Sequence, residues 1–190
     1  MPALMIDFIT SLDGYGAAEG WPGLWGLAGP EYLSWLQEPS EQAHTALMGR
    51  TTYQLLSGFA AQSDDDSFKQ LTEMPKVVFS STLKTPLTWA NTTLVASDPA
   101  DAVRALKQDG DRPLRTLGSL TLCRSLLAAG LVDRFRVVVF PVINGQTGRD
   151  RIYDAYPEVA LDLVATRTFD GRLQLLEYVP TVLDGPPGAG

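Results

Sequence analysis

LMGRTTYQLL, residues 47–56, joins a short strand to a helix with no loop between them. The apolar residues in its second half recur with helical spacing. The start of a helix has unpaired backbone N–H groups and the positive end of the helix dipole, so Arg50, Thr51 and Thr52 are placed to hold a phosphate. The other interpretation is that the two threonines only cap the helix. This stretch alone leaves both interpretations open.

Strands and helices alternate along the rest of the chain in the same way. Strands are predicted over 3–9, 45–48, 76–81, 92–97, 114–117 and 134–143, helices over 31–37, 50–56, 98–108 and 119–129, a loop over 11–23 and a surface excursion over 58–68. A closing antiparallel hairpin is predicted over 159–180. This alternation predicts an α/β fold, an open and mostly parallel sheet with helices on both faces and an antiparallel edge. Residues 1–180 then form a single domain, and 181–190 are expected to be a disordered tail.

Charge and cysteine content exclude several functions. The 15 Lys+Arg against 22 Asp+Glu give a net charge of −7, and no run of basic residues is present, which argues against a nucleic-acid or anionic-membrane partner. One cysteine, Cys123, and one histidine, His44, can form neither an internal disulfide nor a Cys/His zinc site, so no metal is expected. No apolar segment approaches the roughly 20 residues that a spanning helix needs. The expected location is the cytoplasm.

Small polar residues follow three of the predicted strands. They lie at 49–52, 80–82 and 118–121. Ligands of open α/β sheets bind at the carboxyl ends of the strands, and the missing Cβ of Gly118 lets a phosphate approach the backbone there. Taken alone, 80–82 and 118–121 are better explained as a polar turn and as a glycine turn with a serine cap, and 49–52 leaves both explanations open. Together they offer the phosphate sites that a phosphorylated dinucleotide requires, although neither a G-x-G-x-x-G nor a Walker signature is present.

Five motifs occur in an order that is typical of a known family. They are SLDGYGA at 11–17, MGRTTYQLL at 48–56, VVFSSTL at 77–83, LGSLTLCRSLLAAGLVD at 117–133 and FPVINGQTG at 140–148. The chain resembles the dihydrofolate reductase-like superfamily, and most closely the reductase half of the bifunctional deaminase-reductase of riboflavin biosynthesis, from about residue 3 to 180. The deaminase half, with its zinc ligands, is absent. The resemblance implies a three-layer fold and an NADPH-dependent reductase that transfers hydride to a small heterocyclic, pyrimidine or pterin-like substrate.

The resemblance also assigns the cofactor contacts. It implies that the phosphates contact Gly49, Arg50, Thr51 and Thr52, and that the 2′-phosphate contacts Ser80, Ser81 and Thr82. The pyrophosphate would contact Gly118, Ser119, Leu120 and Thr121, and the nicotinamide would contact Ile9, Ser11, Asp13 and Gly14. The loop from Gly14 to Trp25 resembles a mobile active-site lid. Gly118-Ser119 replaces the usual Gly-Gly, Asp133-Arg134 the usual Asp-Glu, and the stretch after Phe140 has fewer glycines than is usual. These departures concern the identity of the substrate more than that of the cofactor.

Two carboxylates are candidates for the catalytic proton donor. Glu31 falls near the position of the substrate-binding acid of dihydrofolate reductases, but a glutamate in a first helical turn also favours the helix dipole. Asp7 shares a strand face with Ile9, which directs it toward the substrate in one interpretation; the other interpretation is a structural carboxylate with a buried partner. Trp25 and Trp35 are expected to lie against a flat substrate, although packing of the lid explains them equally well.

Two further expectations concern assembly and activity. The apolar strand at 134–143 and the family resemblance suggest a homodimer. The alternative to an enzyme is a non-catalytic NADP(H)-binding module that acts as a sensor or assembly partner, because a fold does not determine a function.

Overall fold

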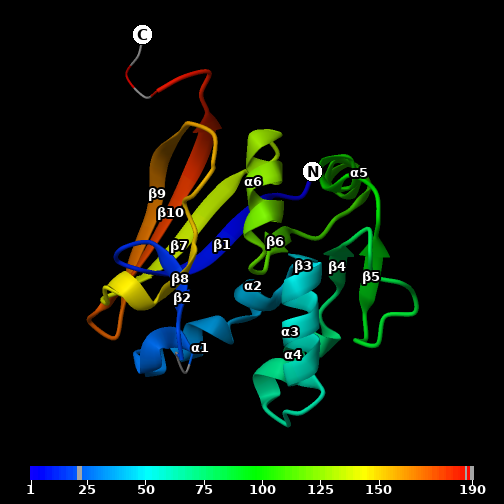
Figure 1. Cartoon of the computed structure of the whole chain (residues 1–190), viewed down its shortest axis with the longest axis horizontal. Helices are drawn as coiled ribbons and strands as arrows, with labels where there is room; N and C mark the ends of the chain where they lie inside the picture. Colours follow the sequence, from blue (N-terminus) through cyan, green and yellow to red (C-terminus); the bar gives the residue numbers. More distant parts are fainter. Residues whose placement is uncertain (21–22, 187, 189–190) are drawn as a thin grey trace.

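A central sheet of eight strands organises the protein, which is described by a computed structural model over residues 1–20, 23–186 and 188 (Figure 1). In spatial order the strands are β5 (Thr92–Val95), β4 (Lys76–Phe79), β3 (Thr45–Gly49), β6 (Leu114–Thr116), β1 (Leu4–Ser11), β7 (Arg134–Phe140), β10 (Leu173–Val182) and β9 (Val159–Phe169). The first six are parallel, and β10 and β9 are antiparallel to their neighbours. The expected α/β fold with a C-terminal antiparallel hairpin is therefore confirmed.

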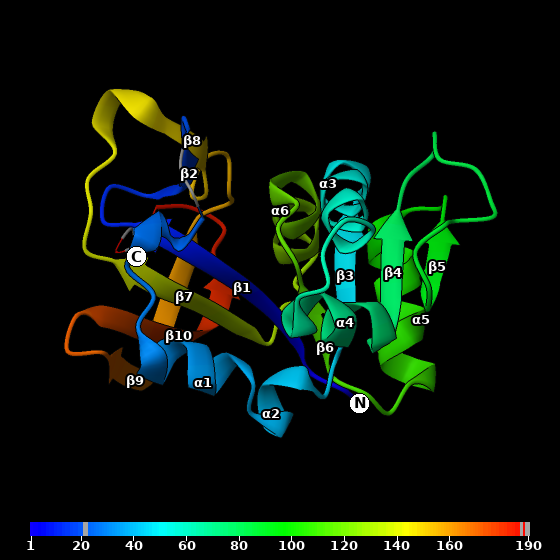
Figure 2. The ribbon, with the colours of Figure 1, turned by 90° about the horizontal axis from the view of Figure 1, so that it is seen from below.

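Helices cover both faces of the sheet. They are α1 (Pro30–Leu36), α2 (Pro39–Gln42), α3 (Arg50–Ala60), α4 (Asp66–Glu73), α5 (Pro99–Asp109) and α6 (Leu120–Ala128), with short 3-10 turns η1 (Leu24–Gly26) and η2 (Gly145–Thr147). Side chains of α5 and α6 pack in one apolar cluster with β1, β3 and β4. On the opposite face α1 packs on β7 and β10, and α3 packs on β3 and β4 (Figure 2). No helix in the described part of the chain is long and apolar enough to cross a membrane.

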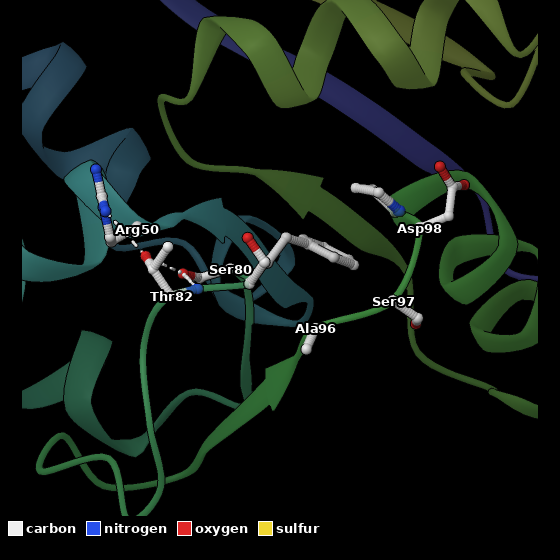
Figure 3. Close-up of a pocket in the computed structure, with 9 residues that line it drawn as sticks. Arg50, Ser80, Thr82, Ala96, Ser97 and Asp98 are labelled. Carbon is white, nitrogen blue, oxygen red and sulfur yellow. Dashed lines mark hydrogen bonds between the residues drawn. The ribbon is translucent and has the colours of Figure 1, made fainter.

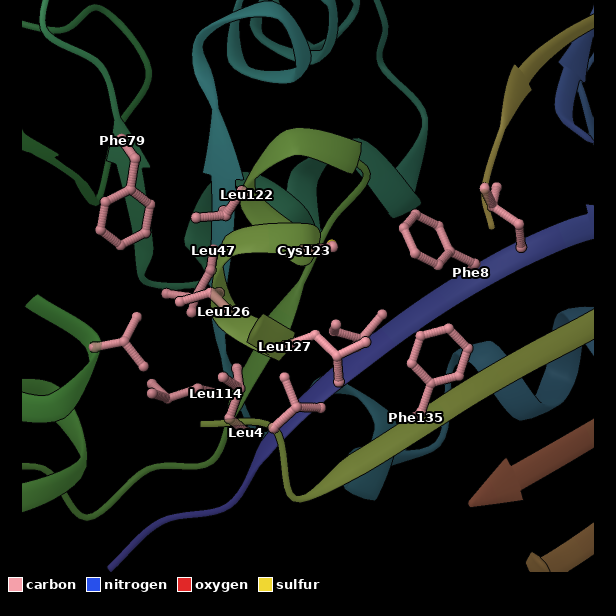
Figure 4. Packing of buried hydrophobic residues seen from close by; sticks show 14 of the residues in the cluster. Leu4, Phe8, Leu47, Phe79, Leu114, Leu122, Cys123, Leu126, Leu127 and Phe135 are labelled. Atoms are coloured by element: carbon pink, nitrogen blue, oxygen red, sulfur yellow. The ribbon is translucent and has the colours of Figure 1, made fainter. Parts of the chain in front are cut away.

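Alternation along the strands divides the core between the two faces. On β1, Leu4, Ile6 and Phe8 point toward α6, where they meet Leu126 and Leu127 (Figure 4). Side chains in between point to the face covered by α1, as the two-residue period of a strand requires.

Strand β7 is apolar because both of its faces are covered. Val137 packs in the cluster under α6 and Val138 in the cluster under α1. The strand lies between β1 and β10. The apolar run that suggested a dimer surface at 134–143 is therefore the interior of one sheet, and a dimer needs another surface.

Four short elements and several boundaries differ from the sequence-based prediction. Within the expected loop at 11–23, β2 (Tyr15–Ala18) pairs with β8 (Gly148–Arg151) in a separate ribbon. The surface excursion at 58–68 contains the end of α3 and the start of α4, which Asp65 caps by accepting a hydrogen bond from the Ser67 N–H. The short α2 was not expected either. The hairpin extends to Val182, two residues into the expected tail.

Candidate functional site

The three predicted phosphate-binding segments meet at one edge of the sheet. Because β3, β4, β5 and β6 are parallel, their carboxyl ends lie together. Gly49 leads directly into α3, the Ser80–Thr82 segment follows β4, and Gly118 and Ser119 connect β6 to α6. The structure thus brings these segments together, as expected for ligand binding in an open α/β sheet.

Ser119 connects the N-termini of α3 and α6. Its Oγ accepts a hydrogen bond of 2.6 Å from the Gly49 N–H and lies 2.9 Å from Thr52 Oγ1. Ser119 itself is in the left-handed region, with a φ of 66°. The serine that replaces the usual glycine therefore holds two helix starts side by side.

The N-terminus of each of these helices has no side-chain cap. Gly49 and Ser119 are the N-cap residues, and neither α3 nor α6 receives a capping hydrogen bond from a side chain. The structure therefore does not support the interpretation that threonines cap α3 or that Ser119 caps α6. The hydroxyls of Thr52 and Ser119 hydrogen-bond to each other instead. Two sets of first-turn N–H groups, with the positive ends of two dipoles, remain for an anion.

An open pocket of about 560 Å³ adjoins this junction (Figure 3). It is lined by Arg50, Phe79, Ser80, Ser81, Thr82, Ala96, Ser97, Asp98 and Pro99. Arg50 Nη1 donates to Thr82 Oγ1 at 2.9 Å, and Ser80 Oγ accepts from the Thr82 N–H at 3.2 Å. Arg50 forms no ion pair with any described carboxylate, so its charge is available to a ligand.

The sequence-based prediction did not include the residues on the other side of the pocket. Ala96, Ser97 and Asp98 follow β5, which lies next to β4 (Figure 3). Asp98 Oδ1 accepts hydrogen bonds from the Ala100 and Asp101 N–H groups and so caps α5. The signal that could have revealed this wall was again the end of a strand, because β5 ends as β4 does.

The expected nicotinamide-side residues form a hydrogen-bonded corner at the end of β1. Asp13 Oδ1 accepts from Ser11 Oγ at 2.6 Å, and its carboxylate also accepts from the N–H groups of Asn144 and Gly145. Hydrogen bonds from Ser11 and from these backbone groups lower the pKa of Asp13 to about 2. The corner therefore joins the end of β1 to the segment after β7 through a charged carboxylate.

Trp25 and Trp35 occupy different environments. Trp25 Nε1 donates to Asn144 Oδ1 at 2.9 Å, and its ring lies 5.2 Å from that of Phe140. Trp35 is only 6% exposed and packs against Phe169 and the guanidinium of Arg136. Trp35 is thus a core residue rather than a substrate contact, and this expectation is corrected. Trp21, also in the expected lid, lies outside the described residues.

Glu31 is engaged with the turn between β9 and β10. Its Oε2 accepts a hydrogen bond of 2.5 Å from the Asp170 N–H, while the Asp170 carboxylate accepts from the N–H groups of Glu31 and Tyr32. The two residues cap α1 reciprocally, in the manner of a capping box. The structure therefore supports the helix-start interpretation of Glu31 and not the proton-donor interpretation.

Asp7 belongs to a cluster of four charged side chains between the sheet and α2. Its two oxygens accept from Nε and Nη2 of Arg136 at 3.1 and 2.7 Å, and Arg136 also bonds to both oxygens of Glu41. Arg115 completes the cluster at 2.9 Å from Glu41. Both Asp7 oxygens are thus occupied by the guanidinium of Arg136. Asp7 is therefore a structural carboxylate, and its assignment as proton donor is corrected.

The fold is that of the dihydrofolate reductase-like α/β proteins. The solved dihydrofolate reductase of Enterococcus faecalis, complexed with NADP(H), is 14% identical with a TM-score of 0.58, and the match covers 94% of this chain and 96% of that one. A Shewanella protein assigned to riboflavin biosynthesis is 19% identical with a TM-score of 0.69, over 94% of this chain and 99% of that one. These likenesses are of fold.

The chain belongs to the RibD C-terminal domain family, whose model matches residues 2–175. Membership supports an oxidoreductase of the reductase type found in riboflavin biosynthesis. Among curated proteins, the uncharacterized protein YyaP of Bacillus subtilis is 26% identical over 183 residues, which is 92% of this chain and 93% of that one.

Proposed function

We propose that this chain is an NADPH-dependent reductase of a small heterocyclic substrate, pyrimidine-like or pterin-like. The observation that carries the proposal is that the starts of α3 and α6, neither with a side-chain cap, adjoin a pocket lined by the positively charged Arg50. Phosphates of a dinucleotide need N–H donors and a cation, and the junction supplies both in adjacent positions.

The chain's residues fit NADPH in three parts. Arg50, Ser80 and Thr82 would hold the 2′-phosphate, because a guanidinium and two hydroxyls lie together there. The N–H groups at the starts of α3 and α6 would hold the pyrophosphate. Ile9 and the corner from Ser11 to Gly14 would lie against the nicotinamide, and NADPH, when bound, supplies the hydride.

Neither Glu31 nor Asp7 is assigned a catalytic role. Each carboxylate is held by partners that also position an element of the fold, Glu31 at the start of α1 and Asp7 beside α2. This observation is what favours the second candidate, an NADP(H)-binding module without catalytic activity. A panel of aminopyrimidines and pterins separates the two, since only a reductase oxidises NADPH in the presence of a substrate.

The decisive test is a titration with NADPH and NADH in parallel, followed by tryptophan fluorescence. We expect the wild-type chain to bind NADPH more tightly than NADH, and the variant Arg50→Ala/Ser80→Ala to lose about 10- to 100-fold in NADPH affinity with NADH affinity little changed. Arg112→Ala, an exposed arginine at the opposite end of the strands, is the matched control and should bind as the wild type does. Absence of binding to either dinucleotide would refute the proposal.

A further inference from the structure

The pocket at the ends of β4 and β5 has two walls, each formed by the segment that follows one of these strands. Phe79 at the end of β4 pairs with Val95 at the end of β5, and the Ser80 N–H donates to the Val95 carbonyl oxygen at 3.0 Å. The chain therefore leaves the sheet at two adjacent points. It forms one wall with residues 80–82 and the other with residues 96–98 (Figure 3).

The two walls differ in charge. Arg50 lies at one side of the pocket and Asp98 at the other (Figure 3), and the two form no ion pair with each other. Among the described residues, no other charged side chain lines the pocket, and Phe79, Ala96 and Pro99 add apolar surface to it. The lining therefore suits a ligand that has an anionic group, a flat apolar body and a hydrogen-bond donor.

The carboxylate of Asp98 is held in place with one oxygen left over. Its Oδ1 accepts hydrogen bonds from the N–H groups of Ala100 and Asp101 at 2.9 and 3.1 Å, which caps α5. No described residue forms a hydrogen bond or an ion pair with Oδ2. An ionised carboxylate accepts hydrogen bonds and donates none. Asp98 Oδ2 therefore offers a ligand an acceptor whose position the cap fixes.

We propose that Asp98 selects adenine as the base of the bound dinucleotide. This inference rests on the proposed function, in which Arg50, Ser80 and Thr82 hold the 2′-phosphate. The 2′-phosphate and the base are attached to neighbouring carbons of one ribose, so the base lies in the same pocket, on the side away from Arg50. Adenine has an exocyclic amino group, which is a donor, where guanine and hypoxanthine have an acceptor oxygen. Asp98 Oδ2 accepts from the amino group and repels the oxygen.

A change of one functional group on the base tests this selection. The reduced form of nicotinamide hypoxanthine dinucleotide phosphate differs from NADPH only in its base, where a carbonyl oxygen replaces the amino group and the adjacent ring nitrogen carries a hydrogen. Both dinucleotides are titrated by tryptophan fluorescence. The wild-type chain should bind NADPH at least about tenfold more tightly, because the analogue loses a hydrogen bond and brings an acceptor to a carboxylate.

The variant Asp98→Asn separates the role of the carboxylate from that of the helix cap. Asparagine caps a helix as well as aspartate does, and with its oxygen on the cap its amide N–H groups become donors toward the pocket. The preference for NADPH over the analogue should fall to about threefold or less. Asp101→Asn makes the same charge change in the first turn of α5 at a residue that does not line the pocket. It is the matched control and should keep the wild-type preference.

The outcomes separate this inference from the proposed function. Equal affinity of the wild-type chain for NADPH and the analogue would overturn the inference and leave the reductase proposal standing. A gain in affinity by the same factor for both dinucleotides in Asp98→Asn would mean that the carboxylate only repels phosphates, and would overturn the inference as well. So would a loss of preference in Asp101→Asn as large as that in Asp98→Asn. If neither dinucleotide binds, the proposed function and the inference fail together.

Discussion

Gly118 lies just before α6 and close to Thr52 in the first turn of α3. Its φ is 58°, and a Cβ built on it would lie 3.0 Å from Thr52 Oγ1. Both conditions favour glycine. A left-handed backbone is strained for other residues, and a Cβ here would also come unusually close to Thr52, the threonine that bonds to Ser119. The geometry of the proposed phosphate site therefore depends on a residue without a side chain.

We expect Gly118→Ala to lower the free energy of unfolding by about 1–3 kcal/mol and to weaken NADPH binding as well. Urea denaturation and the NADPH titration measure the two effects. Gly58→Ala is the matched control, since Gly58 lies inside α3 with open space around it and should gain roughly 0.5–1 kcal/mol. Equal behaviour of the two variants would contradict this account of the junction.

At the residue scale, position relative to a strand end was the informative signal. Arg50, Ser80 and Gly118 could be identified because each lies in a polar segment that closely follows a strand. Asp98 also follows a strand but was not identified, because its place in the pocket becomes clear only once β5 is known to lie next to β4. The partner of Asp7 could not be found either, because Arg136 is 129 residues away in the sequence.

At the element scale, α1 depends on a cap from a distant turn. Its N-cap residue, Gly29, has no side chain, and Asp170 supplies the carboxylate from the turn between β9 and β10. The helix and the C-terminal hairpin therefore stabilise each other.

Asp170→Ala should lower the free energy of unfolding by about 0.5–2 kcal/mol, as loss of an N-cap does elsewhere. Asp170→Asn keeps an acceptor oxygen and tolerates the positive φ of 52° at this position, so its free energy of unfolding should fall clearly less than that of Asp170→Ala. Thermal unfolding of both variants provides the comparison. A loss in the asparagine variant as large as that in the alanine variant would argue against the cap.

Apolar patterning predicted the buried strands and the hairpin well and the exposed short elements poorly. Even β4 and β6, with four and three residues, could be identified, because burial makes most of their side chains apolar, and the hairpin is long enough to show a period of 2. Strands β2 and β8 have four residues each and pair across most of the chain, so no local pattern marks them. Helix α4 was hidden in a polar segment, although Asp65 is a typical N-cap.

At the scale of the whole molecule, the charged cluster holds β1, β6, β7 and α2 together. His44 is buried beside it, and its Nδ1 has no hydrogen-bond partner among the described residues. Burial, together with the charge of Arg115, lowers the pKa of His44 from 6.5 to about 3. The folded protein thus keeps this histidine neutral where the unfolded chain protonates it.

Stability should therefore fall as the pH falls from 6.5 toward 3, since over this window the unfolded chain binds a proton that the folded protein does not. The slope due to His44 is at most about 1.4 kcal/mol per pH unit. Urea denaturation between pH 7 and about 5, where ordinary carboxylates stay charged, measures it. His44→Gln removes the titrating group and should show a flatter profile, whereas parallel profiles would exclude this role.

Strand β1 is made before both of the strands that it pairs with. Leu4 pairs with Leu114, and Ile6 pairs with Phe135. During synthesis, β1 leaves the ribosome before either neighbouring strand exists, and its apolar face stays uncovered until α6 has been made. Closing such distant contacts is slow, because the intervening chain must first lose its conformational freedom. The nascent chain is therefore most exposed to chaperones and to aggregation through its own N-terminal strand.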